Sequence, residues 1–457
     1  MMVSGTTRQV LAGLSASLSA LSTGLTYSWS SPILAYLVSP RSHIPMTRDQ
    51  SSWVVSCMEF GCWVTPVLAG KLADSVGRKL TLLATGPLYA LSWVTAIYAR
   101  NVYELYLVRI IQGFCVATIN VVGPMYLGEI SDTKIRGSIG TLFQISVYAG
   151  ILYNYILGSQ LDYWRFQLAN LAISILFMVT FIFAPETPCY FIRKSQDQKA
   201  RQSLLWFRNG QDVNVVENEF EDLKKTIASE SKIKVTLKTL LTSWSSVRCI
   251  LLLQGILVFR IFSPVQTIMA YSDLTFASGD TFIPTQYISI LFAFILLLSI
   301  FPSTCLVDKA GRKVLLLVST LGCAVFSLIS CVYYYVREHQ RVPLPMVYSY
   351  INFVSICGIG VFFNLGLGPL YNPLTCEYFP SNTRALSGAV LAFSSATIQL
   401  VGYMLFYVLY VTFGMYSNFL VSCVVCSFGV IWIQLYIVET KGKSFAEIQA
   451  VFSQQVR

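Results

Sequence analysis

The sequence DSVGRK at residues 74–79 occurs a second time, as DKAGRK, at residues 308–313, and each copy lies between two long apolar runs. Glycine allows the chain to reverse tightly, and an Arg-Lys pair anchors the next apolar span at a lipid headgroup surface. The aspartate can accept hydrogen bonds from the start of a neighbouring helix. The pattern therefore predicts two equivalent turns between membrane-spanning helices, in a chain that is built twice.

The composition is that of an integral membrane protein. Of the 457 residues, 55% are hydrophobic and only 12% are charged, whereas a soluble domain is about 25% charged. The net charge of +10 does not indicate nucleic-acid binding, because the basic residues are dispersed among short turns between apolar spans. We therefore expect the lipid bilayer as a partner and no nucleic acid.

The residues that usually carry chemistry are not grouped in any reactive pattern. The twelve cysteines show no metal-binding spacing, and most lie in apolar runs, where a thiol behaves as a small hydrophobic group. No nucleotide-binding loop is present in the sequence either. We expect no catalytic residues, no enzyme activity, no metal and no cofactor. Residues 9–40 form a long uncharged run that we interpret as the first span rather than a cleavable signal.

Apolar runs of about 20 residues, the length that crosses a bilayer, recur along the whole chain. They predict an all-α membrane protein with twelve transmembrane helices in two pseudo-symmetric halves. The uncharged stretch 385–438 is too long for one helix, so we divide it near Gly414. The expected units are an N-terminal six-helix half at residues 1–185, a cytoplasmic helical linker at 186–247, a C-terminal six-helix half at 248–438 and a cytoplasmic tail at 439–457.

Most of the 32 lysines and arginines fall on the side of the predicted membrane that holds both chain ends and the linker. Loops rich in these residues face the cytoplasm. We therefore expect a multi-pass protein of the plasma membrane with both termini in the cytoplasm. Within the linker, the apolar spacing at residues 204–207 and 220–227 predicts short amphipathic helices rather than a folded domain.

Two further motifs occur in both halves and in the same order. A glutamate and an arginine follow the fourth and the tenth predicted spans, and a Glu-Thr pair follows the sixth and the twelfth. Parallel repeats of this kind are an architecture of alternating-access transporters. The charged residues of these motifs are Glu129, Arg136 and Glu186 in the first half, and Glu377, Arg384 and Glu439 in the second.

Six motifs together carry a resemblance to a known family. They are GKLADSVGRK after span two, YLGEISDTKIRG at the end of span four, PETP at 185–188, DKAGRK after span eight, GPLYNPLTCEYFPSNTR around span ten and ETKGKSFAEI at 439–448. The chain resembles sugar porters of the major facilitator superfamily, especially insect facilitated trehalose transporters and animal facilitative glucose transporters. The resemblance implies the major facilitator fold and transport of a hexose or trehalose-like sugar.

The charged helix ends on the cytoplasmic side have a mechanical interpretation. Opposite charges from the two halves would pair when this face is closed, and in the family that the chain resembles such pairs break when the carrier opens inward. The alternative is that the charges only anchor helix ends. The residues of the predicted latch are Asp74, Gly77, Arg78, Glu129, Arg136, Glu186, Asp308, Gly311, Arg312, Glu377, Arg384 and Glu439.

The predicted substrate site departs from the family pattern, which uses amide side chains and aromatic faces to contact sugar hydroxyls. Arg260 and Ile261 stand where the family has two glutamines, and Leu296 replaces an asparagine. The substrate is still expected to be a sugar or polyol. The residues predicted to contact it are Gln144, Ile151, Arg260, Gln266, Tyr271, Asn364, Asn372 and Gln399.

Arg260 is the most unusual of these residues, because a charge within a membrane span is costly and by default functional. Three explanations remain open: an ion pair with Glu59, contact with an anionic substrate, or solvation in an aqueous cavity. Arg109 is expected in the charge network at the cytoplasmic end. The two histidines, His43 and His339, are expected to be surface residues of the outer loops.

The first span contains no acidic residue, whereas proton-coupled sugar relatives carry one there, so we expect facilitated diffusion. Glu59 is the one embedded carboxylate that could support proton coupling instead. Two other functions stay open at this point. The protein could be a non-transporting, sensor-like relative, or a carrier of a small organic anion that uses Arg260.

Overall fold

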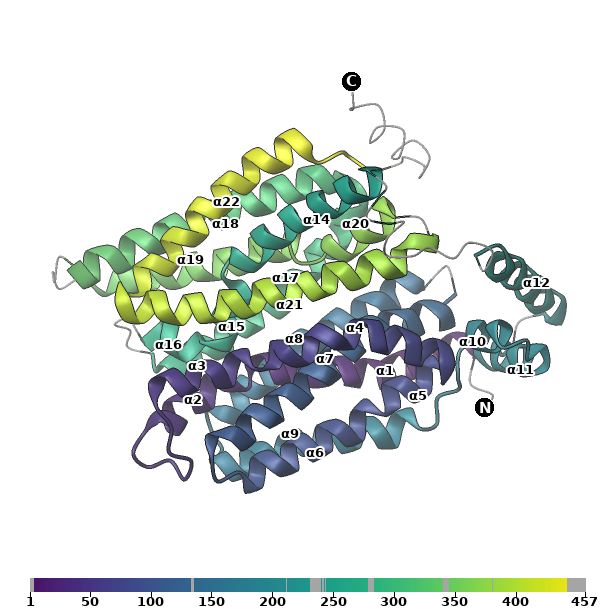
Figure 1. The fold of residues 1–457 in the computed structure, drawn as a ribbon, viewed down its shortest axis with the longest axis horizontal. Helices are drawn as coiled ribbons and strands as arrows, with labels where there is room; N and C mark the ends of the chain where they lie inside the picture. The colour runs from purple at the N-terminus through teal and green to yellow at the C-terminus, as the bar shows by residue number, and fades with distance from the viewer. Residues whose placement is uncertain are drawn as a thin grey trace.

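The structure is a computed structural model that describes residues 4–132, 135–210, 212–230, 240, 242, 244–277, 283–339, 345–379 and 381–441. Its regular elements within these ranges are all helices (Figure 1). The prediction of an all-α protein is therefore confirmed for the part of the chain described.

The first half of the chain consists of long helices, several of which continue one another through a short break. It contains α1 (Gly5–Ser28), α2 (Ser30–Val38), α3 (Arg48–Ser56), α4 (Met58–Ser75), α5 (Arg78–Leu83), α6 (Thr85–Tyr98), α7 (Val102–Ile130), α8 (Arg136–Gly158) and α9 (Tyr163–Phe181).

Three shorter helices follow, and then a second set of long ones. The short helices are α10 (Pro188–Arg193), α11 (Asp197–Phe207) and α12 (Val213–Glu230). The second set contains α14 (Trp244–Phe262), α15 (Val265–Ala270), α16 (Ser272–Ala277), α17 (Thr285–Ala310), α18 (Arg312–His339), α19 (Met346–Leu365), α20 (Tyr371–Tyr378), α21 (Ser381–Thr412) and α22 (Met415–Tyr436).

Ten segments within the described ranges are long and apolar enough to cross a membrane. They include the combined helices α1–α2, α3–α4 and α5–α6. Helices α8 and α14 are of similar length but are not among the ten. The structure thus supports the prediction of a multi-pass membrane protein, and it supports ten of the twelve predicted spans.

The long helices form two groups, one from each half of the chain, as the purple to blue and the green to yellow ribbons show in Figure 1. In the first group, α1 packs against α8 and α4 against α7, and in the second α18 packs against α19 and α22. The groups meet where α4 packs against α21 and α8 against α17. These two contacts pair the second predicted span of one half with the fifth of the other, as a duplicated bundle requires.

Glycines allow the closest of these helix contacts within the first half. A side chain at Gly24 would overlap the backbone carbonyl of Val147 on α8, and one at Gly113 would overlap that of Met58 on α4. Small residues at such crossings let two membrane helices approach until their backbones touch. Close packing of this kind is what holds membrane helices together, because lipid supplies no hydrophobic force between them.

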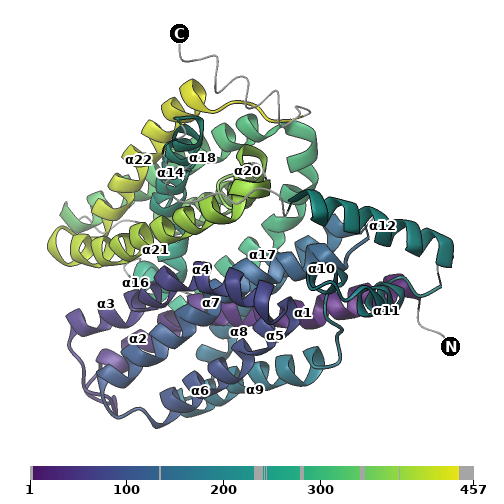
Figure 2. The ribbon, with the colours of Figure 1, turned by 45° about the vertical axis from the view of Figure 1, so that its right-hand side comes forward.

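The two halves are hydrogen-bonded at one end of the bundle. The Ser30 hydroxyl donates to the carbonyl of Ala270 at 2.9 Å, and the Ser31 and Ser272 hydroxyls lie 2.7 Å apart. Figures 1 and 2 show the two groups converging at this end, near α2 and α16, and diverging toward the end that holds α10 and α11. No hydrogen bond between described residues joins the halves at that diverging end.

Helices α10–α12 are amphipathic, as predicted, and they also form a packed unit. Their apolar faces share a small core that contains Leu204 and Phe220. This unit is fastened to the first half, because Arg208 Nη1 donates to the carbonyl of Ile130 at 3.0 Å and Gln9 Nε2 donates to that of Phe207 at 2.9 Å. Amphipathic periodicity could not show whether the helices pack on one another or on a surface.

Candidate functional site

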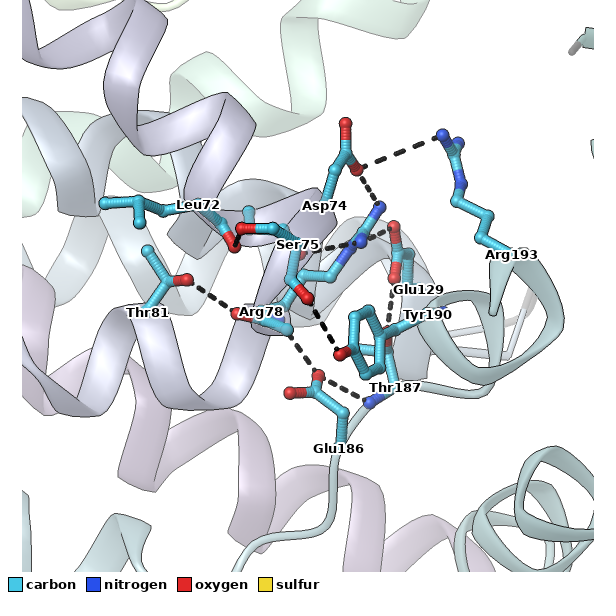
Figure 3. Close-up of polar contacts among 12 residues, drawn as sticks. Leu72, Asp74, Ser75, Arg78, Thr81, Glu129, Glu186, Thr187, Tyr190 and Arg193 are labelled. Carbon is cyan, nitrogen blue, oxygen red and sulfur yellow. Dashed lines mark hydrogen bonds and ion pairs between the residues drawn. The ribbon is translucent and has the colours of Figure 1, made fainter. Parts of the chain in front are cut away.

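The first copy of the repeated turn builds a buried charge network between α4, α5 and α7 (Figure 3). The side chain of Arg78 is 0% exposed and pairs with Asp74 at 3.0 Å and with Glu129 at 3.1 Å. Arg78 Nη1 also donates to the carbonyl of Ala73 at 3.0 Å. Gly77 precedes Arg78 with φ +115°, a conformation that favours glycine and that turns the chain from α4 into α5. The sequence thus places a fully desolvated arginine between two carboxylates.

The Glu-Thr pair after α9 completes this network. Glu186 accepts hydrogen bonds from the backbone N–H groups of Arg78 and Lys79 at 3.1 and 3.0 Å, where α5 begins. A carboxylate at this position complements the partial positive charge of a helix start. The Thr187 hydroxyl donates to Glu129 Oε2 at 2.5 Å. Three motifs that are far apart in the sequence therefore form one hydrogen-bonded unit.

The second half repeats this arrangement. Glu439 accepts from the backbone N–H groups of Arg312 and Lys313 at 2.9 and 3.0 Å. Arg312 Nε lies 3.2 Å from Glu377 Oε1, and the Thr440 hydroxyl donates to Glu377 Oε2 at 2.5 Å. The duplication inferred from the sequence is therefore also a duplication of geometry.

The residues of the predicted latch fall into these two separate networks. Each ion pair among the described residues of the latch lies within one half of the chain. Arg136 is exposed at the start of α8, and the side chains of Asp308 and Arg384 lie outside the described residues. In this conformation the described charges anchor helix ends, and the pairing of charges across the halves stays a prediction.

The pKa values of the two glutamates in the Glu-Thr pairs are shifted in opposite directions. Burial raises the pKa of Glu186 and outweighs the hydrogen bonds that Glu186 accepts from the backbone of Thr187 and Lys79. Burial also acts to raise the pKa of Glu439, but there the backbone N–H groups that donate to the carboxylate lower the pKa below its ordinary value. The same sequence motif thus sits in two electrostatic environments.

The centre of the bundle contains a polar cluster that spans both halves. Asn364 on α19 accepts a hydrogen bond from the Tyr148 hydroxyl on α8 at 2.6 Å. The Asn364 amide donates to Ser299 Oγ at 2.7 Å. The Arg260 guanidinium lies over the ring of Tyr371, 5.5 Å from its centre. We call Tyr148, Arg260, Ser299, Asn364 and Tyr371 the central cluster.

The other predicted substrate residues are distributed around the bundle. Tyr271 is buried, stacks on Phe406 at 5.2 Å between ring centres, and has a hydroxyl without a hydrogen-bond partner in the described part of the chain. Of the remaining predicted residues, Ile151 and Gln399 are buried, Gln144 and Gln266 are partly buried, and Asn372 is exposed.

The proposed ion pair between Arg260 and Glu59 is not formed: neither appears among the ion pairs of the described residues. Glu59 is buried on α4, and the cation that acts on its carboxylate is Arg109. Of the three explanations for Arg260, contact with a substrate and solvation remain.

Arg109 does not belong to the charge network at the end of α7. Its guanidinium donates to the backbone carbonyls of Val54 and Thr26 at 3.0 and 2.9 Å and to Gln112 Oε1 at 3.0 Å. It lies near the start of α7, about 30 Å along the helix axis from Glu129. The expectation was wrong because α7 is one continuous helix, which places Arg109 toward the end opposite Glu129.

The two histidines are part of aromatic clusters. His43 is partly buried, stacks on Trp164 at 5.3 Å and lies 3.0 Å from the Tyr36 hydroxyl, and its burial lowers its pKa. His339 is exposed and stacks on Tyr335 at 4.8 Å. The surface prediction therefore holds for His339 and is incomplete for His43.

The sequence interpretation missed Tyr148, Ser299 and Tyr371 as members of the central cluster. Tyr148 follows Gln144 by one helical turn, so the two share a helix face, and this spacing could have identified it. Ser299 lies in an otherwise apolar run, and nothing in its neighbourhood distinguishes it from a helix-packing serine. Only the approach of α17 to α19 reveals its role.

The fold is the one adopted by a solved transporter of the major facilitator superfamily. The chain superimposes on the inward-open conformation of the xylose transporter XylE from E. coli with a TM-score of 0.77 at 19% identity, covering 97% of this chain and 98% of that one. The proton:xylose symporter XylE bound to 6-bromo-6-deoxy-D-glucose gives a TM-score of 0.75 at 18% identity, with the same coverage.

The chain belongs to the sugar (and other) transporter family, whose model matches residues 14–452. It is 26% identical to the facilitated trehalose transporter Tret1 of Bombyx mori, over 96% of this chain and 86% of that protein. It is 28% identical to the facilitated trehalose transporter Tret1-2 homolog of Drosophila sechellia, over 96% and 90%. These matches confirm the resemblance and the transporter class predicted from the sequence.

Proposed function

We propose that this protein moves a sugar across the plasma membrane by facilitated diffusion, with both chain termini in the cytoplasm. The observation that carries the proposal is the central cluster, where the Tyr148 hydroxyl of one half meets Asn364 of the other at 2.6 Å. A solute held at this position contacts both halves, so its binding is coupled to their relative movement.

The polar groups of the central cluster suit a polyhydroxylated ligand. Tyr148, Asn364 and Ser299 form a chain of donors and acceptors that is built from neutral groups. A sugar hydroxyl both donates and accepts, so it can replace either member of such a pair without leaving a buried group unsatisfied. The names of the trehalose-transporting relatives point to the same class of solute.

The structure corresponds in this proposal to the inward-facing state. The hydrogen bonds between Ser30 and Ala270 and between Tyr155 and Met269, at 2.9 and 2.7 Å, close the end away from α10–α12. Closing the opposite end would bring the two charge networks toward each other. The predicted latch would then form between the halves, and it would stabilise the outward-facing state.

The experiment that tests this function is uptake of labelled glucose and trehalose by oocytes with confirmed surface expression. We expect saturable uptake that equilibrates without accumulation and that a protonophore leaves unchanged. Asn364→Ala should lower uptake at least about tenfold, because the substitution removes hydrogen bonds at the point where the halves meet. Thr180→Val, on the exposed face of α9, serves as the matched control and should transport normally.

Accumulation of sugar that collapses with a protonophore would replace facilitated diffusion by proton coupling, for which Glu59 beside Arg109 is the embedded carboxylate. Absence of uptake of both sugars, together with no binding of either by the purified protein, would contradict the proposal.

A further inference from the structure

Two arginines lie within the apolar part of the bundle, and the structure treats them differently. Arg109 is 1% exposed, and its guanidinium donates to two backbone carbonyls and to Gln112 within 3.0 Å. Arg260 is partly buried, and its guanidinium donates no hydrogen bond to any described residue. Arg109 is thus fixed by hydrogen bonds, as a structural residue is. The guanidinium of Arg260 has no such bond with the described residues.

Arg260 also has no counter-ion among the described residues. The described residues form no ion pair with it, and its Nε is buried without an acceptor. The ring of Tyr371 at 5.5 Å offsets only part of the cost of a partly desolvated charge. The Tyr371 hydroxyl is itself buried without a partner. The site therefore presents a cation and a hydroxyl that nothing in the described part of the chain satisfies.

The position of Arg260 places these unused donors beside the proposed substrate. Tyr148, which hydrogen-bonds to Asn364, and Tyr371 both lie close enough to Arg260 to interact with its charge. The central cluster thus combines neutral groups that suit hydroxyls with one guanidinium. A guanidinium binds a carboxylate through two parallel hydrogen bonds, which it cannot do with a single hydroxyl.

We propose that Arg260 makes the central cluster selective for sugars that carry a carboxylate, such as uronic acids. This inference rests on the proposed transport function and specifies the substrate class of the same site. The hydroxyls of the solute bind to the chain formed by Tyr148, Asn364 and Ser299, and its carboxylate pairs with Arg260. A neutral sugar would leave the arginine unpaired and would therefore bind less tightly.

The first experiment uses the wild-type protein in proteoliposomes with labelled glucuronate, glucose and trehalose. We expect saturable glucuronate uptake, competed by galacturonate, with an apparent affinity about tenfold or more above that for glucose. Glucose or trehalose uptake without any uptake or competition by glucuronate would overturn this inference and leave the proposed function intact. Failure to take up all three sugars would overturn both.

The second experiment compares Arg260→Gln with Arg260→Lys and with Arg165→Gln, which removes a charge from an exposed outer residue. We expect Arg260→Gln to lose glucuronate uptake and to keep or gain glucose uptake, so retained glucose transport would show that the variant is folded. Arg260→Lys should keep part of the glucuronate uptake, and Arg165→Gln should match the wild type. Equal glucuronate uptake by the wild type and Arg260→Gln would contradict the inference and favour an arginine that is merely solvated.

Membrane potential gives a readout that does not depend on any substitution. A singly charged anion that is carried without a second ion accumulates about 50-fold inside at equilibrium when the inside is 100 mV positive. The reason is that 59 mV corresponds to a tenfold concentration ratio for one charge. Glucose should reach equal concentrations on both sides under the same potential. A glucuronate concentration ratio at equilibrium that changes with neither the membrane potential nor the pH gradient would contradict its transport as an anion.

Discussion

The two copies of the charge network share the hydrogen bonds of their glutamates and threonines, and they have different surroundings. In the first copy the side chain of Arg78 is 0% exposed, and in the second that of Arg312 is 19% exposed. The first copy is covered by α10, where Tyr190 places its ring 6.0 Å from the Arg78 guanidinium and donates its hydroxyl to the carbonyl of Ser75 at 3.2 Å (Figure 3). Duplication fixes the bonds of such a network, whereas its burial depends on what packs over it.

This difference has energetic consequences. A buried ion pair costs much of its attraction in desolvation, but removing one partner leaves the other as an uncompensated charge. The partly exposed copy can recover hydration when a partner is lost. The first network should therefore be the more fragile of the two, although both are drawn from the same motifs.

The largest expected effect comes from Glu129→Gln compared with Glu377→Gln. The first substitution leaves the buried Arg78 with only the exposed carboxylate of Asp74 as its counter-ion among the described residues, and it should lower the free energy of unfolding by about 3 to 5 kcal/mol. The second acts on the partly exposed Arg312 and should cost about 1.5 to 3 kcal/mol. Thermal unfolding in detergent micelles measures both. Equal losses would mean that the cover over the first network has no energetic role.

A smaller difference is expected between Gly77→Ala and Gly311→Ala. The glycines have φ of +115° and +87°, which an alanine adopts at a cost of about 1 to 3 kcal/mol in each copy. At Gly77 the new methyl would lie 2.2 Å from Oε2 of Glu186, while at Gly311 it would lie 2.8 Å from Oε2 of Glu439. Gly77→Ala should therefore destabilise the protein more. An equal shift in melting temperature for the two variants would contradict this ranking.

The smallest expected effect is the pH dependence of the two glutamates. The folded-state pKa of Glu186 is above its ordinary value of 4.5, so its contribution to stability is present below pH 4.5 and is lost as pH rises through the folded-state pKa. The folded-state pKa of Glu439 is below that value, so its contribution is present above pH 4.5 and is lost as pH falls through the folded-state pKa. Relative to Glu186→Gln and Glu439→Gln, the wild-type stability should change with opposite slopes.

Unfolding curves of these variants between about pH 2 and pH 7 measure the slopes, below pH 4.5 for Glu439 and above it for Glu186. Tyr190→Ala provides the control, because removing the ring exposes the first network and should weaken the slope attributed to Glu186. Slopes of the same sign for both glutamates would show that the cover formed by α10 does not control their titration.

The repeated turn shows why so much of the fold could be predicted. A bilayer requires long apolar helices, and DSVGRK with DKAGRK locates two equivalent ends of such helices in the chain. Six-residue motifs of this kind act locally, through a glycine that turns the chain and charges that stay at the interface. Periodicity and composition are therefore sufficient for the class, the duplication and the family.

The central cluster shows why the site could be predicted only in part. Asn364 and Arg260 were identified because polar residues in apolar spans are conspicuous, but Ser299 was not, since serine is common in membrane helices. The ion pair of Arg260 with Glu59 was a reasonable pairing of opposite charges, and it failed because α4 packs against α7, so that Arg109 is the cation that acts on the Glu59 carboxylate. The sequence identifies the charged residues, but only the packing of the helices shows which residues lie beside them.

The sequence by itself determined that this protein is a duplicated, all-helical membrane transporter of the sugar (and other) transporter family, because these properties follow from apolar length, motif order and local turn chemistry. The tertiary structure decided which copy of the charge network is buried, that Arg109 is bound by backbone carbonyls, and that the Arg260 guanidinium donates to none of the described residues. The physical reason is the same in each case. The energy of a charge depends on the distance to its partners and on its exposure to water, and both are set by helices that are remote in sequence.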